Sequence, residues 1–174
     1  MARSRVRMKL YLGDQAPETS PAARSISRDD LPALGELMLA AYRDTIDYEG
    51  ETLKEAVAEV RGTLDGQYGP FLGDCSFLIE EKGQLLAACM ITWSAELKAP
   101  LLTFSMTRPK AQRRGMGTML IKTSINALVD RGHRDLYLVV TEGNAPALHL
   151  YEKMGFRAVQ KITGGGATDE GEGR

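Results

Sequence analysis

The stretch that decides the fold is residues 101–118, which read LLTFSMTRPKAQRRGMGT. Residues 101–107 are mostly apolar or favour extended backbone, which predicts a buried strand. The strand ends near Pro109, and a loop containing glycine follows. Apolar residues then recur at helical spacing from Met116 to Leu128, so a helix begins there. The segment is therefore predicted to be a strand, a glycine loop and a helix in succession.

The loop before this helix suits a phosphate group. Gly115 and Gly117 let backbone N–H groups converge without side chains in the way. The helix start adds partial positive charge, and Arg113 and Arg114 add full charges. The dinucleotide-binding motif needs a glycine where Leu120 stands, and a P-loop needs a Gly-Lys pair that the sequence lacks. The alternative to a phosphate site is an ordinary helix start with solvated arginines.

Regular patterns continue on both sides of this segment. Downstream, residues 136–140 form an apolar run typical of a strand covered on both faces. Asn144 then caps a helix that ends at Gly155, and residues 156–162 form a last strand. Upstream, the pattern predicts strands over about 4–12, 24–27, 75–80 and 85–93. It also predicts two helices, one that Asp29 or Asp30 caps and one over residues 51–64.

This order of elements predicts an α/β fold, a mixed sheet with helices on both faces. The strand-helix-strand unit over residues 101–140 should be parallel with a right-handed crossover. We expect a single domain over residues 1–163, which includes the N-terminal strand. Residues 164–174 contain five glycines and no large apolar side chain, which predicts a disordered tail.

The composition narrows the functional classes. The 174 residues include 22 basic and 23 acidic side chains, a net charge of −1, which argues against nucleic-acid binding. The longest apolar stretch is about half of a membrane-spanning helix, and no signal-peptide pattern opens the chain. Cys75 and Cys89 fit no zinc or redox spacing, and neither His133 nor His149 belongs to a metal-ligand pattern. We therefore expect a cytoplasmic protein without a metal, a membrane or a nucleic-acid partner.

Two motifs carry the functional signal. Pro109, Gln112, Gly115 and Gly117 form the pattern Pro-x-x-Gln-x-x-Gly-x-Gly, and about 30 residues on a second pattern reads Asn-x-x-Ala-x-x-x-Tyr-x-x-x-Gly-Phe. Its members are Asn144, Ala147, Tyr151, Gly155 and Phe156. Both motifs resemble those of the GNAT superfamily of acyl-CoA-dependent N-acetyltransferases. The resemblance is sharpest over residues 75–162.

The resemblance implies a GNAT-like sheet in which two parallel strands splay apart around CoA. The pantetheine arm would pair like an added strand with Ser105, Met106 and Thr107. Asn144 would cap its helix and also approach the cofactor. The pyrophosphate would bind the loop residues Gln112, Arg113, Arg114, Gly115, Met116, Gly117 and Thr118.

By the same resemblance, Tyr151 is the general acid that protonates the departing thiolate. A phenol has an ordinary pKa of about 10, so it holds its proton at neutral pH. The alternative for this residue is a core aromatic. The general base is left open, because Thr103 and Val139 stand where many family members have a glutamate. Glu96, Glu142 or a water molecule are the candidates.

The function implied is transfer of an acetyl group from acetyl-CoA to a primary amine by direct attack in a ternary complex. The acceptor would be a small molecule or a peptide, and the enzyme is compatible with a homodimer. The stretch between the first two helices contains acidic and phenolic residues, namely Tyr42, Asp44, Asp47, Tyr48, Glu49 and Glu51. Such a stretch would attract a cationic amine; the alternative is a solvated loop. The alternative function is an acyl-CoA-binding sensor or scaffold without turnover.

Overall fold

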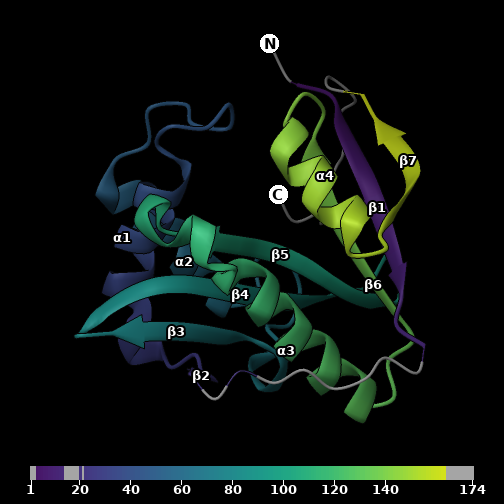
Figure 1. Cartoon of the computed structure of the whole chain (residues 1–174), viewed down its shortest axis with the longest axis horizontal. Coiled ribbons are helices and arrows are strands. Elements are labelled where there is room, and N and C mark those ends of the chain that lie inside the picture. Colours follow the sequence, from purple (N-terminus) through teal and green to yellow (C-terminus); the bar gives the residue numbers. More distant parts are fainter. Residues whose placement is uncertain (1–2, 14–19, 21, 164–174) are drawn as a thin grey trace.

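The computed structural model describes residues 3–13, 20 and 22–163, and its elements follow the predicted order (Figure 1). The predicted tail, residues 164–174, lies outside the described residues. The strands are β1 (Arg5–Tyr11), β2 (Ala23–Ser25), β3 (Phe77–Glu81), β4 (Gln84–Ser94), β5 (Ala99–Thr107), β6 (Asp135–Thr141) and β7 (Arg157–Ile162). The α-helices are α1 (Leu31–Tyr42), α2 (Leu53–Leu64), α3 (Met116–Asp130) and α4 (Ala145–Lys153). Short 3-10 turns are η1 (Arg28–Asp30), η2 (Gly73–Cys75) and η3 (Pro109–Arg114).

One predicted strand begins a few residues later than expected, and one predicted helix cap is made differently. The strand predicted from residue 75 begins at Phe77, because Cys75 completes η2 by donating its backbone N–H to the Leu72 carbonyl. Asp30 is the N-cap residue of α1, as predicted, but its side chain makes no capping hydrogen bond to that helix. Ser27 caps η1 by accepting from the Asp29 backbone N–H, and the Asp30 carboxylate accepts from the Ser27 backbone N–H. A local turn therefore precedes each of these elements.

The seven strands form one mixed sheet, in the order β2-β3-β4-β5-β6-β1-β7. The pair β5–β6 is parallel and the other neighbouring pairs are antiparallel. The N-terminal strand β1 lies between β6 and β7 and pairs with both. It is thus a central member of its half of the sheet, as Figure 1 shows.

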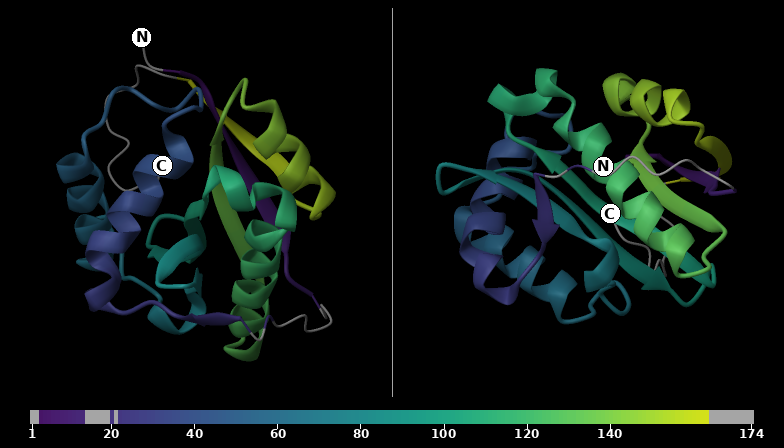
Figure 2. Two further views of the ribbon diagram at one scale, coloured as in Figure 1. Left: turned by 60° about the vertical axis from the view of Figure 1, so that its left-hand side comes forward. Right: turned by 60° about the horizontal axis from the view of Figure 1, so that its bottom comes forward.

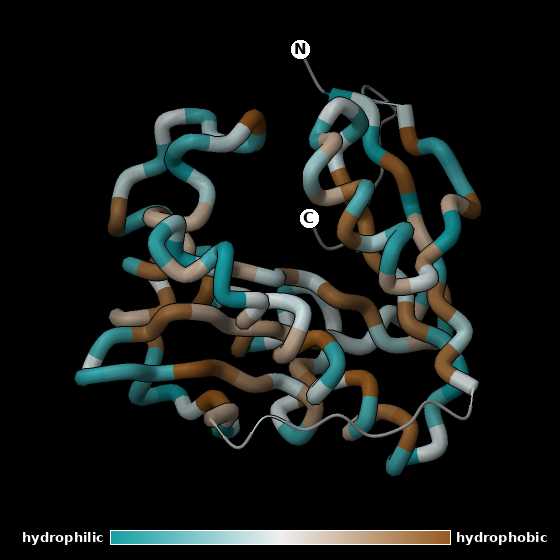
Figure 3. Tube along the Cα trace, viewed as in Figure 1, coloured by the Kyte–Doolittle hydropathy of each residue, from teal (hydrophilic) through white to brown (hydrophobic). Residues whose placement is uncertain are grey.

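Helices cover both faces of the sheet, which confirms the predicted architecture (Figure 2). One core lies between the strands and α3, with residues of α4 packed at its margin; Leu120, Ile121 and Ile125 of α3 are fully buried there. The second core lies on the opposite face, beneath α1 and α2. Apolar residues follow the strands through the middle of the chain trace in Figure 3. The alternation of β1 and the helical spacing of α3 therefore place their apolar sides as the sequence predicts.

The parallel strands β5 and β6 pair only where they begin. Leu101 pairs with Tyr137 and Leu102 with Leu138. On its other side β5 carries a bulge, because Met90 of β4 lies opposite Phe104 while Ile91 lies opposite Leu102, which leaves Thr103 as an extra residue. A bulge bends its strand and increases the local twist. Beyond it β5 and β6 diverge (Figure 1), and no described residue pairs with this edge of β5.

Candidate active site

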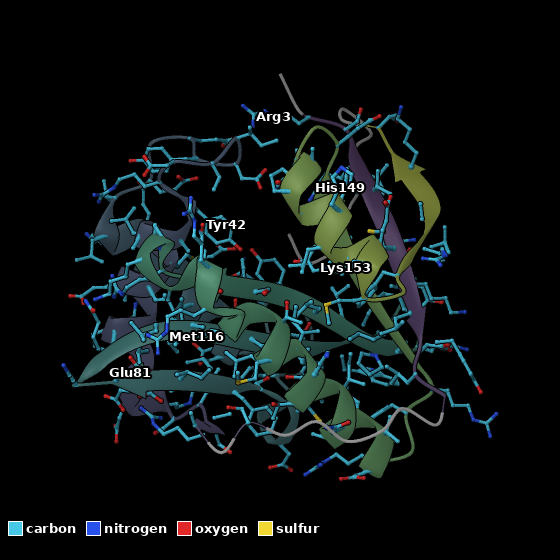
Figure 4. The ribbon with its side chains drawn as sticks, viewed as in Figure 1. Arg3, Tyr42, Glu81, Met116, His149 and Lys153 are labelled. Atoms are coloured by element: carbon cyan, nitrogen blue, oxygen red, sulfur yellow. The ribbon has the colours of Figure 1, made fainter. Side chains whose placement is uncertain are left out.

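A cavity of about 520 Å³ lies where β5 and β6 diverge. That volume is within the range of small-molecule sites. Residues of the two strands, of α4, of the segment joining α1 to α2, and of the N-terminus line it. Figure 4 shows Tyr42, at the end of α1, in the space that faces α4. The gap between two strands therefore continues directly into a wider chamber under the α1–α2 segment.

Tyr151 lies in this cavity, where the sequence predicts the general acid. Its ring packs edge-on against Phe156, with 5.7 Å between ring centres, so its orientation is fixed. Burial, reinforced by the nearby Cys89 thiol, raises the pKa of its hydroxyl to about 12, and a hydrogen bond with Ser105 partly offsets this. The phenol consequently holds its proton across the physiological pH range and is available as a donor.

Beneath the gap lies Cys89 of β4, which pairs with Ser105 of β5. Its side chain is completely buried, and its sulfur accepts a 3.4 Å hydrogen bond from the Ser124 hydroxyl. Burial raises the pKa of the Cys89 thiol to about 12. Because the thiolate and not the thiol is the nucleophile, this cysteine is inert at neutral pH.

The predicted phosphate loop forms the junction between β5 and α3. Gly115 adopts a left-handed conformation with φ of 71°, and no side chain caps α3. Met119 donates its backbone N–H to the Gly115 carbonyl, so the N–H groups of Met116, Gly117 and Thr118 stand at the open end of the helix. An added Cβ on Gly117 would lie 3.0 Å from the Thr107 hydroxyl oxygen. The loop therefore lies tight against the end of β5 and suits an anion.

This loop is also attached to the hairpin between β3 and β4. Arg114 donates two hydrogen bonds to Glu81, at 2.7 and 3.0 Å, and they hold the pKa of that carboxyl below its usual range. The Arg108 Nε donates to the Leu85 carbonyl at 2.8 Å. Glu81 lies at the hairpin tip in Figure 4. Arg113 is exposed, whereas Arg114 is directed to the hairpin.

The other predicted cofactor residues are distributed along the gap. Ser105 and Asn144 line the cavity, and the Asn144 side chain caps α4 by accepting from the Ala147 backbone N–H at 3.3 Å. The Met106 side chain is buried in the core beneath α1 and α2, which leaves its backbone for the expected strand pairing. Gln112 is exposed, and its amide donates to the Thr107 carbonyl at 3.4 Å.

The two carboxylates proposed as bases lie outside the cavity lining. Glu96 has 57% of its side chain exposed and lies 3.8 Å from an Arg7 nitrogen. Glu142 has 46% exposed and lies 3.2 Å from the Lys161 ammonium. Both carboxylates therefore form surface ion pairs and are not among the residues that line the cavity with Tyr151.

Other carboxylates line the cavity instead, namely Asp47, Glu49, Glu51, Glu55 and Glu59. Arg3 and Arg5 are the cations of the lining, and Figure 4 shows Arg3 near the N-terminus, at the side that faces the α1–α2 segment. The first three carboxylates belong to the segment singled out in the sequence. Sequence reasoning missed Glu55 and Glu59, although their spacing of four residues places them on one face of α2.

Asp47 is attached to the opposite wall of the cavity. Its carboxylate accepts a 2.6 Å hydrogen bond from the hydroxyl of Thr141, the last residue of β6. Ile46 reaches the same wall, since its Cδ1 would lie 3.9 Å from a Cβ added to Gly143. The segment between α1 and α2 thus spans the cavity from α1 to the end of β6.

The sheet opens between two parallel strands, with a phenol in the opening and an uncapped helix start beyond the end of β5, an arrangement that suits an acyl thioester with an anionic tail. The chain belongs to the Acetyltransferase (GNAT) family, whose model matches residues 38–156. The residues that the structure describes include no helix long and apolar enough to cross a membrane. They also include no group of three or more His, Cys, Asp or Glu side chains arranged to hold a metal ion.

The relatives in sequence include named acetyltransferases. The [ribosomal protein bS18]-alanine N-acetyltransferase of Salmonella typhimurium is 41% identical over 71 residues, which cover 41% of this chain and 47% of that protein. The streptothricin acetyltransferase of Streptomyces lavendulae is 29% identical over 93 residues, 53% of this chain and 49% of that protein. The chain thus spans about half the length of the curated relatives it matches.

Solved structures share the fold. The ribosomal-protein-S18-alanine N-acetyltransferase of Escherichia coli has a TM-score of 0.63 at 23% identity, covering 79% of this chain and 78% of that one. A GCN5-related N-acetyltransferase from Sphaerobacter thermophilus has a TM-score of 0.69 at 19% identity, covering 91% and 49%. The predicted fold class is therefore confirmed.

Proposed function

We propose that the protein transfers the acetyl group of acetyl-CoA to a primary amine by direct attack within a ternary complex. The observation that carries the proposal is the opening between β5 and β6, with Tyr151 in the chamber and the open N-terminus of α3 beyond the end of β5. The unpaired edge of β5 suits a peptide-like arm. The open helix end suits a diphosphate.

The chemistry follows from these positions. The nitrogen of a neutral amine attacks the thioester carbonyl, and the C–S bond breaks. The thiolate takes the proton of the Tyr151 phenol, and the tyrosinate then recovers the surplus proton of the amide nitrogen. Transfer through a covalent acyl-enzyme is disfavoured, because the buried Cys89 thiol has a pKa of about 12 and is a poor nucleophile. One continuous cavity reaches from the gap between the strands to the α1–α2 segment, and this supports direct transfer.

The charge of the chamber favours a cationic acceptor. Five carboxylates and two arginines line it, and a cavity with an excess of one charge raises the local concentration of opposite charge. Relatives are named for ribosomal protein bS18 and for streptothricin, so a peptide N-terminus and a basic small molecule are both acceptors to try.

The test is a thiol-release assay with acetyl-CoA and a panel of amines. The panel includes peptides with N-terminal alanine, aliphatic polyamines, and neutral amines of similar size. We expect release that depends on a cationic amine and acetylation of that amine by mass spectrometry. An acyl-CoA-binding sensor without turnover is the second candidate, because Thr103 and Val139 occupy the positions of the usual glutamates. Tight acetyl-CoA binding with no turnover on any amine would favour it.

A further inference from the structure

The cavity contains a carboxylate placed to take a proton from the acceptor. Asp47 contributes to the lining together with Tyr151. Its oxygen is 2.6 Å from the Thr141 hydroxyl, which joins it to β6, the strand that borders the gap. A carboxylate held against this strand faces the place where an amine would approach a thioester lying between β5 and β6.

Strand geometry fixes the side on which this contact occurs. Residues 136, 138 and 140 of β6 are buried in the core against α3. Because side chains alternate along a strand, Val139 and Thr141 point to the opposite side, toward α1. Asp47 meets β6 on that side. Its carboxylate is hydrogen-bonded to Thr141, the next residue after Val139 on the same side of β6. The side chain of Val139 itself cannot accept a proton.

A second observation places Asp47 near the reacting groups. Tyr42 is partly buried; desolvation of its phenol raises the pKa, and the nearby Tyr151 and Asp47 raise it further. Figure 4 shows Tyr42 in the space that faces α4, the helix of Tyr151. The three side chains thus share one region of the cavity.

Three of the other four carboxylates of the lining, those of Glu51, Glu55 and Glu59, are engaged within the α1–α2 region. Glu51 accepts from the Glu49 backbone N–H at 3.1 Å. Glu55 accepts from the Thr52 backbone N–H at 3.1 Å, as part of the α2 capping box. Glu59 accepts from the Tyr68 hydroxyl. Asp47, in contrast, has its hydrogen-bond partner on the far wall of the cavity.

We propose that Asp47, held by Thr141, is the general base that deprotonates the acceptor ammonium. The proposal rests on the proposed acetyl transfer. An N–H bond of the bound ammonium breaks and its proton moves to an Asp47 oxygen. The freed lone pair then forms the C–N bond as the C–S bond breaks. Tyr151 protonates the thiolate and recovers the surplus proton of the amide nitrogen, while Asp47 releases its proton to solvent.

Asp47→Asn is the decisive variant, because the amide oxygen still accepts from Thr141 and the fold is preserved. General bases contribute about 10²–10⁴-fold, and water can partly substitute, so we expect a loss in kcat of about 10²-fold with a cationic alkylamine. With a fluorinated amine that is already neutral at the assay pH, no proton has to be removed before attack. The loss should then shrink to less than about tenfold.

Two further variants sharpen the test. Glu36→Gln changes an exposed carboxylate of α1, outside the lining, and should leave kcat unchanged with both amines. Thr141→Val removes the hydroxyl that positions Asp47 and should lower kcat several-fold, again mainly with the cationic amine. These variants leave unchanged the other charged and titratable residues that line the cavity with Asp47, which are Arg3, Arg5, Tyr42, Tyr48, Glu49, Glu51, Glu55, Glu59 and Tyr151.

Equal losses of Asp47→Asn with the two amines would assign Asp47 to ammonium binding and overturn the base role. An unchanged kcat would overturn it as well. Wild-type protein that binds acetyl-CoA but acetylates neither amine would instead refute the proposed function, and the base assignment with it.

Discussion

Removal of the Tyr151 hydroxyl has an effect that can be worked out from the structure. Tyr151→Phe keeps the ring that packs edge-on against Phe156 at 5.7 Å. It deletes a hydroxyl that is hydrogen-bonded to Ser105, and the net loss of such a bond costs about 1 kcal/mol of folding free energy. The variant should therefore fold and bind acetyl-CoA.

The expected rate loss lies at the low end of general-acid effects, which are about 10²–10⁴-fold. Burial raises the pKa of Tyr151 from 10.0 to about 12, which makes the phenol roughly a hundredfold weaker as an acid. With a Brønsted sensitivity of about 0.5, that weakening lowers its kinetic advantage by about tenfold. We expect kcat to fall by about 10²-fold, with the KM for acetyl-CoA nearly unchanged, because the proton is needed only in the transition state.

The assay is steady-state thiol release, with a pre-steady-state measurement to establish that chemistry limits the rate. Tyr137→Phe is the matched control, since that hydroxyl belongs to β6 but lies outside the cavity lining. It should retain wild-type kcat. Wild-type turnover by Tyr151→Phe with rate-limiting chemistry would refute the acid assignment and leave Tyr151 as a core aromatic.

Three further outcomes follow from the loop and the buried thiol. Gly115→Asp should weaken acetyl-CoA binding in calorimetry by more than about tenfold through charge repulsion. Gly132→Asp is the control and should not weaken it, because Gly132 lies at the other end of α3 and is also at positive φ in open space. Equal effects of the two variants would show that acetyl-CoA binds elsewhere. Glu81→Gln should tighten binding about two- to fivefold at low salt, because it removes a negative charge and releases Arg114; weaker binding would show that Arg114 serves to hold the loop. The pKa of Cys89 rises from 9.0 unfolded to about 12 native, so its contribution to stability is complete below pH 9 and is lost as pH rises toward 12. The stability difference between wild type and Cys89→Ala in urea should therefore shrink by about 1 kcal/mol from pH 8 to pH 10, and a constant difference would contradict this.

The sequence predicts the elements well because hydrophobic periodicity is local. Alternation identifies β1, and helical spacing identifies α3 and its buried face. The two motifs predict which residues border the gap, and Ser105, Asn144 and Tyr151 do line the cavity. Their roles toward acetyl-CoA stay predictions.

Contacts between distant segments could not be predicted in this way. The hydrogen bond between Asp47 and Thr141 joins residues 94 positions apart, and the pairing of Arg114 with Glu81 spans 33. Neither leaves a periodic trace in the sequence. The place of β1 between β6 and β7 is likewise set by tertiary pairing, since its alternation fits any partner of matching register. Glu96 and Glu142 were predicted from their closeness in sequence to a strand end, but they are not among the residues that line the cavity.

The short pairing between β5 and β6 has a consequence for the stability of the protein in the cell. Two paired positions, at Leu101 and Leu102, connect one half of the sheet to the other, so backbone pairing across the middle of the sheet is short. A donor arm that occupies the gap as a strand would complete it and would act as a folding ligand. At a concentration one hundred times its Kd, such a ligand adds about 2.7 kcal/mol of stability. The abundance of the folded protein would then follow the cell's supply of the acyl donor, and starvation for that metabolite would expose the chain to proteolysis.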